Sequence, residues 1–229
     1  MHKLIKPSEL LDLVNDGDTI MVGGFLNVGG PNKIIMYLLE NKDLKDLTII
    51  ANDTGMEQKP GISQIVIRKC AGKVVASHIG TCRETGRQMS AGELDVELVP
   101  QGTLTERIRA AGYGLGGVLT PTGVGIEEIE AGKQKFEFDG KTYLYEAPLK
   151  ADVALLNAHT VDMMGNMRFK GSSRVHSTAM AFAADKVIVE ADNLLTDSYV
   201  GPDSVHIPGL LITHIIDGSK LDENGKEID

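Results

Sequence analysis

Residues 19–31 read Thr19-Ile20-Met21-Val22-Gly23-Gly24-Phe25-Leu26-Asn27-Val28-Gly29-Gly30-Pro31. Residues 19–22 predict a short buried strand, and Pro31 suits the start of a helix over Asn32–Glu40, because that position needs no backbone N–H. The glycines between them let backbone amides approach a ligand at the helix N-terminus, where the helix dipole favours negative charge. The residues alone leave two alternatives open, a ligand-binding loop and a tight structural turn.

The spacing of these glycines excludes two common nucleotide-binding loops. A dinucleotide-binding loop has the pattern G-x-G-x-x-G, and a Walker loop ends in Gly-Lys followed by Ser or Thr. Residues 23–31 match neither pattern. The segment is therefore not predicted to bind a dinucleotide or a nucleoside triphosphate in either of these ways.

The order of strand, loop and helix repeats along the chain after a first helix over Ser8–Val14. Short apolar runs predict further strands at 47–51, 73–77 and 96–99. Helical patterns begin near Glu84 and span Thr103–Ala111. Short apolar strands without polar alternation are typical of a parallel sheet that is covered on both faces. We therefore expect an α/β fold with an open, mainly parallel sheet and flanking helices.

The pattern changes between residues 135 and 146. Two short strand-like runs flank Asp139-Gly140 and predict a β-hairpin insertion with a tight turn. Strands at 153–156, 187–190 and 210–213 and a helix over 177–184 then resume the earlier order. We expect one domain over residues 1–220 and a polar C-terminal tail over residues 221–229, frayed and solvated.

Composition and charge limit the function classes. The chain has 229 residues with 23 basic and 32 acidic side chains, and its formal charge of −9 disfavours binding to a phosphate backbone. No apolar run approaches the roughly 20 residues of a membrane span, and the first residues lack the apolar core of a signal peptide. Cys70 and Cys82 show no metal-ligand or redox-motif spacing. We expect a cytoplasmic protein with reduced thiols that binds neither nucleic acid nor membrane.

Residues 16–31 closely resemble a signature of the alpha chains of family I CoA-transferases. That signature runs from a polar turn through three apolar residues to Gly-Gly-Phe and, after a short spacer, to Gly-x-Pro. Further segments resemble the same subunits, namely Ile50-Ala51-Asn52-Asp53-Thr54, Ala76-Ser77-His78-Ile79-Gly80-Thr81, Val99-Pro100-Gln101-Gly102-Thr103-Leu104, Thr120-Pro121-Thr122-Gly123-Val124-Gly125 and residues 181–191. The resemblance covers nearly the whole chain and is strongest to alpha subunits of acetate/butyrate–acetoacetate CoA-transferases.

The resemblance implies a reaction that moves CoA between two carboxylic acids. The donor would be a short-chain acyl-CoA such as acetyl- or butyryl-CoA, and the acceptor acetoacetate or another carboxylic acid. In this family a glutamate attacks the thioester, forming a mixed anhydride and then a glutamyl–CoA thioester in a ping-pong cycle. CoA is thus a substrate, and no metal or prosthetic group is implied. Consistently, the histidines share no metal-ligand spacing: His159, His176, His206 and His214.

The family's nucleophilic glutamate lies in a Ser-Glu-Asn-Gly motif of the beta subunit. This chain contains Glu-Asn-Gly at Glu223, but Asp222 precedes it and the segment is a polar tail, whereas a nucleophile needs a rigid support. Ser90-Ala91-Gly92-Glu93 is no better match. We therefore expect no catalytic residue in this chain, no activity without a homologous beta subunit, and an α2β2 heterotetramer.

The resemblance also implies which residues of this chain meet the substrates. CoA and the acyl group would lie near the glycine loop, formed by Gly23, Gly24, Phe25, Leu26, Asn27, Val28 and Gly29. The Gln101 amide would donate to a developing oxyanion or a substrate carboxylate, and Asn52 would line the same pocket. Both follow strands, and ligands of open α/β sheets gather at the carboxyl ends of strands. A purely local structural role remains the alternative for each amide.

Other polar residues are expected to be structural or solvated. The proposed reaction needs no general base, so His78 is expected to have a structural role. Ordinary solvated charges are expected for the arginines Arg107, Arg109, Arg168 and Arg174. Two rival functions stay open: a sugar-phosphate isomerase or hydrolase, which would need a carboxylate base and a convergent phosphate loop, and a non-enzymatic ligand-binding domain on a related α/β fold.

Overall fold

The strand β1 (Thr19–Val22) lies at the centre of a seven-stranded sheet in the computed structural model, which describes residues 3–228. The strand order is β13-β11-β8-β1-β2-β3-β4, and all of its recorded pairings are parallel. The other strands are β2 (Leu47–Asp53), β3 (Ala71–His78), β4 (Asp95–Leu98), β8 (Ala151–Ala158), β11 (Ala184–Ala191) and β13 (His214–Asp217). The predicted α/β fold with a mainly parallel sheet is confirmed.

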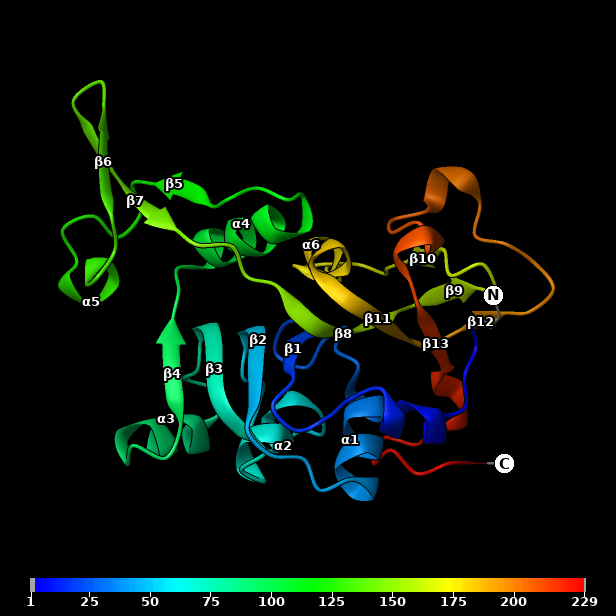
Figure 1. Cartoon of the computed structure of the whole chain (residues 1–229). Coiled ribbons are helices and arrows are strands. Elements are labelled where there is room, and N and C mark those ends of the chain that lie inside the picture. Colours follow the sequence, from blue (N-terminus) through cyan, green and yellow to red (C-terminus); the bar gives the residue numbers. More distant parts are fainter. Residues whose placement is uncertain (1–2, 229) are drawn as a thin grey trace.

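The strand order reverses between β1 and β8 (Figure 1). From β1 the chain adds β2, β3 and β4 on one side, and from β8 it adds β11 and β13 on the other. In open α/β sheets this reversal opens a crevice at the carboxyl ends of the two central strands. The glycine loop follows β1 directly, so it lies at this position.

Helices cover both faces of the sheet. On one face lie α1 (Asn32–Asn41), α2 (Ile62–Ile67) and α3 (Arg83–Ser90), and on the other α4 (Gln101–Gly112) and α6 (Ser177–Ala183) (Figure 1). Consecutive strand residues point to opposite faces. Ile20 of β1 accordingly belongs to the apolar cluster under α1 and α2, and Met21 belongs to the cluster under α4 and α6. Burial on both faces explains why the strands read as uninterrupted apolar runs.

Three elements differ from their prediction. The helix expected over Ser8–Val14 is the short 3-10 helix η1 (Pro7–Asp12), and α2 was not predicted. The strand expected at 210–213 is instead the 3-10 turn η3 (Gly209–Leu211), followed by β13. Leu210 is 91% exposed and only Ile212 of this run is buried in the core, so the run does not form a buried strand.

An arm, residues 118–146, projects from the domain between α4 and β8 (Figure 1). It contains β5 (Val118–Thr120), α5 (Glu127–Glu130), β6 (Lys135–Phe138) and β7 (Lys141–Glu146), with the antiparallel order β5-β7-β6. Asp139 and Gly140 join β6 to β7 with φ of 50° and 71°, as a tight hairpin turn requires. The predicted hairpin is confirmed.

Smaller elements complete the chain. A three-stranded sheet contains β9 (Thr160–Asp162), β10 (Met167–Arg168) and β12 (Leu194–Leu195), and two 3-10 turns are η2 (Pro202–Ser204) and η4 (Gly218–Lys220). Residues 3–5 run beside the edge strand β13: Leu4 forms a parallel bridge with Ile215, and the Ile5 N–H donates to the Ile215 carbonyl at 2.9 Å. The opposite edge of the large sheet is β4.

The C-terminal segment is packed, which corrects the expectation of a frayed tail. Leu221 is fully buried, and the Ile228 N–H donates to the Lys220 carbonyl at 2.9 Å. Gly225 lies against the backbone of α1 at Tyr37, where a Cβ would overlap main-chain atoms. The polar residues of this run form a turn, and its Gly225 packs against the surface of α1. A polar sequence was therefore a poor indicator of a frayed segment here. The last residue of the predicted tail, Asp229, lies outside the described residues.

Two further expectations concern thiols and membranes. Cys70 and Cys82 are both buried as free thiols. Among residues 3–228, no helix combines the length and the apolar character that crossing a bilayer would require. In the same part of the chain, no three His, Cys, Asp or Glu side chains are arranged to hold a metal ion.

Candidate active site

The glycine loop turns back on itself between Phe25 and Val28. The Phe25 N–H donates to the Val28 carbonyl at 3.0 Å, and the Val28 N–H donates to the Phe25 carbonyl at 2.8 Å. Leu26 and Asn27 at the tip both have positive φ, 49° and 67°, the pattern of a type I′ turn. The Phe25 and Val28 side chains remain 44% and 60% exposed. The loop is thus a tight turn that leaves two apolar side chains exposed.

Two glycines are needed for this shape. Gly24 has φ of 100°, and a Cβ on it would lie 2.7 Å from the Gly30 nitrogen. Gly29 has φ of 65°, and a Cβ on it would overlap Ser173 in the loop before α6. At Gly24 and Gly29 the backbone therefore approaches other parts of the same chain closely, as only glycine permits.

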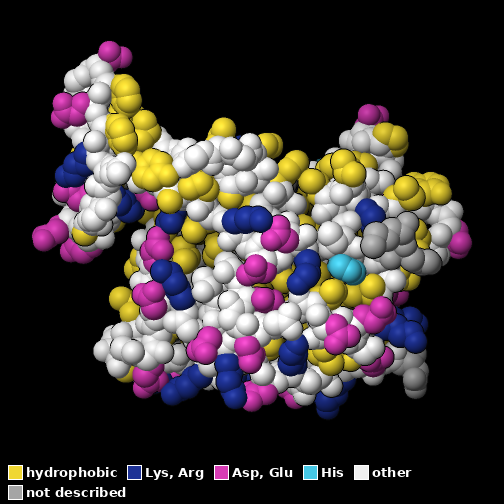
Figure 2. All heavy atoms as spheres, in the orientation of Figure 1, with side chains coloured by type: hydrophobic (Ala, Val, Ile, Leu, Met, Phe, Trp, Pro, Cys, Tyr) yellow, Lys and Arg dark blue, Asp and Glu magenta, His cyan; other side chains and the backbone are white. Residues whose placement is uncertain are grey.

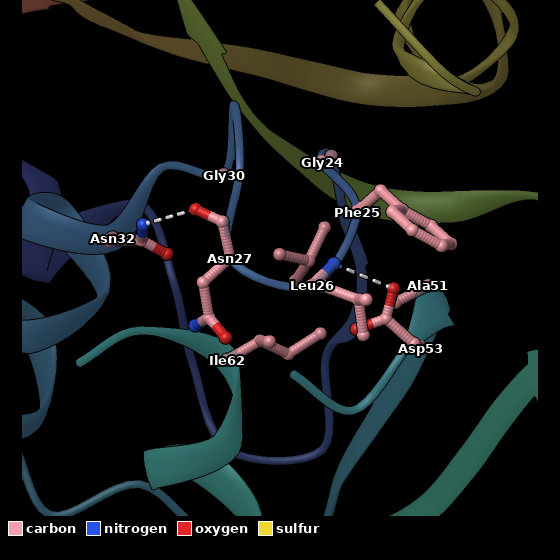
Figure 3. Close-up of a pocket in the computed structure, with 11 residues that line it drawn as sticks. Gly24, Phe25, Leu26, Asn27, Gly30, Asn32, Ala51, Asp53 and Ile62 are labelled. Carbon is pink, nitrogen blue, oxygen red and sulfur yellow. Dashed lines mark hydrogen bonds between the residues drawn. The ribbon is translucent and has the colours of Figure 1, made fainter. Parts of the chain in front are cut away.

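Asn27 anchors the loop to the rest of the domain. Its Oδ1 accepts the Met56 N–H at 2.7 Å, and its Nδ2 donates to the Pro60 carbonyl at 2.9 Å. Its main-chain carbonyl accepts from Asn32 Nδ2 at 2.9 Å (Figure 3). Both polar ends of the Asn27 side chain therefore have protein partners.

A small hollow lies under the loop (Figure 3). Its lining comes from residues 22–27, Gly30, Asn32, Ala51, Asp53 and Ile62. The hollow has room for about one water molecule. A hollow of this size does not admit an acyl chain.

Asn52 and Gln101 come together although 49 positions separate them. Asn52 lies near the carboxyl end of β2, and Gln101 begins α4 after β4. Gln101 Nε2 donates to Asn52 Oδ1 at 2.6 Å. Asn52 is 1% exposed, whereas Gln101 is exposed. The two amides therefore form one unit in which Gln101 is the accessible group and Asn52 supports it.

Asp53, next to Asn52, connects this unit to the glycine loop. Its Oδ2 accepts the Leu26 N–H at 3.0 Å and Asn52 Nδ2 at 2.9 Å, and its Oδ1 accepts the Gly55 N–H at 2.7 Å. The carboxylate is 3% exposed. Sequence reasoning did not single out Asp53, although its position at a strand end beside Asn52 was a usable signal.

His176 is a further member of the network that sequence reasoning missed. Its Nε2 lies 3.0 Å from Asn52 Oδ1, and its Nδ1 lies 2.8 Å from Thr105 Oγ1. Burial lowers the pKa of His176, and the Asp53 charge offsets part of this effect. His176 precedes α6 and is 124 positions from Asn52, so no local pattern could have joined them. His78, by contrast, is exposed at the end of β3.

The N-terminus of α1 already has an anion, as the helix dipole favours, and it comes from the protein itself. Glu190 Oε2 at the end of β11 accepts the Lys33 and Ile34 N–H groups, both at 3.0 Å. Burial raises the pKa of Glu190 to about 7, and the backbone hydrogen bonds act in the opposite direction. The positive end of the helix dipole thus stabilises the protein's own carboxylate and not a bound phosphate.

Arg107 also differs from its expectation as a solvated charge. It is 7% exposed, its Nη1 donates to Glu97 Oε1 at 2.5 Å, and its Nε donates to the Ala147 carbonyl at 2.9 Å. Its Nε also lies 3.8 Å from Glu146, which receives Lys133 Nζ at 2.6 Å. Arg107 therefore ties α4 to β4 and to the base of the arm.

A glycine turn beside a polar side chain at the carboxyl ends of strands in a parallel sheet is a feature of α/β enzymes that bind ligands there. The family model "Coenzyme A transferase" matches residues 6–218. The chain belongs to the coenzyme A transferase family. This assignment confirms the resemblance and the prediction of an enzyme of the transferase class, and it favours that class over an isomerase, a hydrolase or a non-enzymatic domain.

Curated relatives match over most of their length. The chain is 49% identical over 214 residues to the alpha subunit of the acetate CoA-transferase of Escherichia coli (strain K12), covering 93% of this chain and 96% of that protein. It is 47% identical to the alpha subunit of the acetoacetyl-CoA:acetate/butyrate CoA transferase of Clostridium acetobutylicum, covering 93% and 97%. It is 38% identical to the corresponding subunit of a probable succinyl-CoA:3-ketoacid coenzyme A transferase of Bacillus subtilis (strain 168), covering 97% and 93%.

Solved structures share the fold at lower identity. The acyl-CoA transferase YdiF of Escherichia coli O157:H7, solved as a thioester complex with CoA, superposes with a TM-score of 0.81 at 20% identity. This chain is covered completely and spans 50% of the YdiF chain. Glutaconate coenzyme A-transferase of Acidaminococcus fermentans has a TM-score of 0.79 at 18% identity, covering 93% of this chain and 75% of that one.

Proposed function

We propose that this chain is the alpha subunit of a CoA-transferase acting on short-chain acids. It would move CoA between acetyl- or butyryl-CoA and acetoacetate or another carboxylic acid. The observation that carries this proposal is the 49% and 47% identity, over 93% of the chain, to alpha subunits named for acetate and for acetoacetyl-CoA:acetate/butyrate.

The proposed reaction proceeds through a glutamate of a partner beta subunit. The glutamate oxygen attacks the thioester carbonyl, and the tetrahedral adduct then breaks its C–S bond, which releases CoA as a thiolate and leaves a mixed anhydride. The thiolate then attacks the glutamyl carbonyl, releasing the first acid as its carboxylate and leaving a glutamyl–CoA thioester. The second acid takes up CoA by the reverse steps, so the cycle needs no added oxidant or reductant.

In this proposal Gln101 is the group of this chain nearest the chemistry. Each attack on a carbonyl develops negative charge on its oxygen, which a preorganised N–H donor stabilises. Gln101 Nε2 uses one N–H on Asn52, so its second N–H remains available. Phe25 and Val28 on the glycine loop would contact the acyl or CoA chain, in keeping with their exposure.

The surroundings of Glu223 support a nucleophile on another polypeptide. Glu223 is exposed in the turn that packs against α1, where the Asp222 N–H donates to the Lys226 carbonyl at 2.9 Å. The amide unit of Asn52 and Gln101 instead follows β2 and β4 at the carboxyl ends of the strands. We therefore assign the nucleophile to a homologous beta subunit in an α2β2 assembly, located in the cytoplasm.

Exposed apolar side chains on and beside the arm supply a surface for that partner (Figure 2). They are Tyr113, Leu115, Leu119, Val124, Ile126, Phe136 and Phe138. Contiguous exposed apolar surface is typical of protein interfaces. Because this chain spans half of the YdiF chain, a second polypeptide of similar size is the occupant that we propose for the arm.

Co-expression tests the proposal directly. The chain is produced with and without the beta subunit of the same organism, and CoA exchange between acetoacetate and acetyl- or butyryl-CoA is measured. We expect activity only for the pair, and borohydride or hydroxylamine trapping should map the glutamyl–CoA thioester to the beta subunit. A pair that is inactive with every short-chain acyl donor would overturn the proposed reaction. Activity of this chain alone would overturn the assignment of the nucleophile.

A further inference from the structure

One oxygen atom of Asp53 serves both the glycine loop and the amide unit. Oδ2 accepts the Leu26 N–H at 3.0 Å and Asn52 Nδ2 at 2.9 Å. We infer that Asp53 is a positioning residue, whose carboxylate sets the orientation of the Asn52 and Gln101 amides and the tautomer of His176. Only its consequence for CoA transfer rests on the proposed function.

The orientation of Asn52 follows from the chemistry of its neighbour. A carboxylate has acceptor oxygens only, so the Asn52 atom that faces Asp53 is the nitrogen. The Asn52 Oδ1 is then directed away from Asp53, toward Gln101 and His176. Because Asn52 is 1% exposed, water does not compete for either end of its amide.

This orientation determines what Gln101 and His176 must supply. Both face the same acceptor, Asn52 Oδ1, at 2.6 Å and 3.0 Å, so both bring an N–H to it. Gln101 therefore keeps its nitrogen inward, and its carbonyl oxygen and second N–H are left for a ligand. His176 then carries its proton on Nε2, which leaves its Nδ1 as an acceptor 2.8 Å from the Thr105 hydroxyl. That hydroxyl also lies 3.0 Å from the Gln101 main-chain carbonyl, so its single proton can go to either acceptor.

A second arrangement of the same network has as many hydrogen bonds. If the Asn52 amide turns over, its Nδ2 donates to Nε2 of His176, whose proton moves to Nδ1. Thr105 can accept that proton, because its hydroxyl then donates to the Gln101 main-chain carbonyl at 3.0 Å. Gln101 must also turn, and it would show a different pattern of donors and acceptors to the substrate. The Asp53 carboxylate is the group that selects between the two arrangements.

Asp53→Asn replaces the carboxylate by an amide of the same shape, and so removes the group that selects between the two arrangements. An amide has one acceptor oxygen where the carboxylate has two. If the oxygen of the new amide at position 53 faces Leu26 and Asn52, the Gly55 N–H loses its acceptor. If that oxygen faces Gly55, the Asn52 amide turns over and the Leu26 N–H loses its acceptor. Each arrangement leaves one backbone N–H unpaired, so we expect both to be populated.

The measured quantity is the tautomer of His176, observed by 15N NMR of the full chain with labelled histidine at pH 7.5. The His176 ring signals are assigned as those that disappear in His176→Gln. We expect the Nε2–H form alone in the wild type and an added Nδ1–H form in Asp53→Asn. Exchanging the two residues, Asn52→Asp with Asp53→Asn, restores an acceptor beside His176 and should return the Nε2–H form alone. The inference is overturned if Asp53→Asn shows only Nε2–H, or if the exchanged pair keeps the Nδ1–H form.

Asp162→Asn is the matched control. Asp162 is also fully buried, and it accepts the Met164, Asn166 and Val200 N–H groups, but in the small sheet away from the amide unit. The Asp162→Asn variant should be less stable than the wild type and should keep the wild-type tautomer of His176. A change of the His176 tautomer in this variant would also overturn the inference. With the beta subunit, kcat should fall in Asp53→Asn and recover in part in the exchanged pair. A tautomer change in a complex without any transferase activity would refute the proposed function while leaving the positioning role intact.

Discussion

The carboxylate of Glu190 accepts the backbone N–H of Ile34 at 3.0 Å, although 156 positions separate these residues in the chain. The contact joins the end of β11 to the first turn of α1, directly after the glycine loop. Asn157 Nδ2 donates to the other Glu190 oxygen at 3.2 Å. A buried carboxylate therefore holds the helix that follows the loop, and burial raises its pKa to about 7.

Glu190 should make stability depend on pH. Because its pKa is raised from 4.5 in the unfolded chain to about 7, the folded protein binds more protons between these values. The favourable contribution is complete below pH 4.5 and is lost as the pH rises toward 7, by up to about 3 kcal/mol. Urea unfolding of Glu190→Gln from pH 5 to 8 should show a flatter dependence than the wild type. Glu128→Gln, which removes an exposed carboxylate of the arm, should keep the wild-type slope; equal slopes in all three proteins would contradict this assignment.

Gly24→Ala should disrupt the loop. The variant combines a φ of 100° with a Cβ at 2.7 Å from Gly30, and we expect a loss of about 2–3 kcal/mol of stability and most of the activity. Gly114→Ala is the control, since Gly114 also has positive φ, 69°, but no atom lies within 4 Å of the added Cβ. It should cost about 1 kcal/mol and keep kcat of the complex. Thermal unfolding and steady-state kinetics of both variants check this, and equal behaviour would argue against a steric role.

Gln101→Ala should separate activity from stability. The Gln101 side chain is exposed, so its removal should change the free energy of unfolding by less than about 1 kcal/mol. If its N–H stabilises a developing oxyanion, kcat should fall by about 10²–10³. Gln134→Ala removes an exposed amide of the arm and should leave kcat unchanged. A Gln101→Ala complex with wild-type kcat would exclude Gln101 from the chemistry.

Arg107→Ala should destabilise the fold strongly. Burial raises the pKa of Glu97, but Arg107 and Lys73 together hold that pKa below its usual value. Removing the guanidinium takes away a positive partner of the Glu97 and Glu146 carboxylates, and we expect the free energy of unfolding to fall by about 3–5 kcal/mol. Arg109→Ala, on the same helix, breaks only an exposed pair with Glu106 and should cost less than about 1 kcal/mol. Urea denaturation at pH 7 measures both, and comparable losses would show that the Arg107 network contributes little.

Phe138→Ser should weaken assembly with the beta subunit. Phe138 is 53% exposed at the end of β6, so the isolated chain should remain folded, whereas the affinity for the partner should fall about tenfold or more. Leu210→Ser changes another exposed apolar residue, 91% accessible and outside the arm. Titration calorimetry should give that variant the wild-type affinity. If both variants bind equally well, the arm is not the docking surface.

Local patterns predicted the elements that depend on neighbouring residues. The strand before Gly23, the helix after Pro31 and the hairpin at Asp139-Gly140 were all found where glycine, proline or an apolar run marked them. The general rule for strand ends also brought Asn52 and Gln101 to one place.

Partners that are distant in the sequence account for what the sequence did not reveal. His176 and Glu190 act on residues 124 and 156 positions away, and the burial of Arg107 depends on Glu146 from the arm. No local periodicity encodes such contacts. The strand expected at 210–213 failed for a related reason: its apolar residues satisfied the pattern, but Leu210 faces solvent and the pairing with β11 begins only at His214.

The two edges of the large sheet have a consequence for handling the chain without its partner. Residues 3–5 cover β13, and the opposite edge strand, β4, has only four residues and carries Asp95 and Glu97 next to Lys73 of β3. Neither edge offers a long, flat, apolar template on which strands of other molecules could add. Strand addition is thereby disfavoured at both edges of the large sheet, so concentrating this chain on its own should not drive association through that sheet.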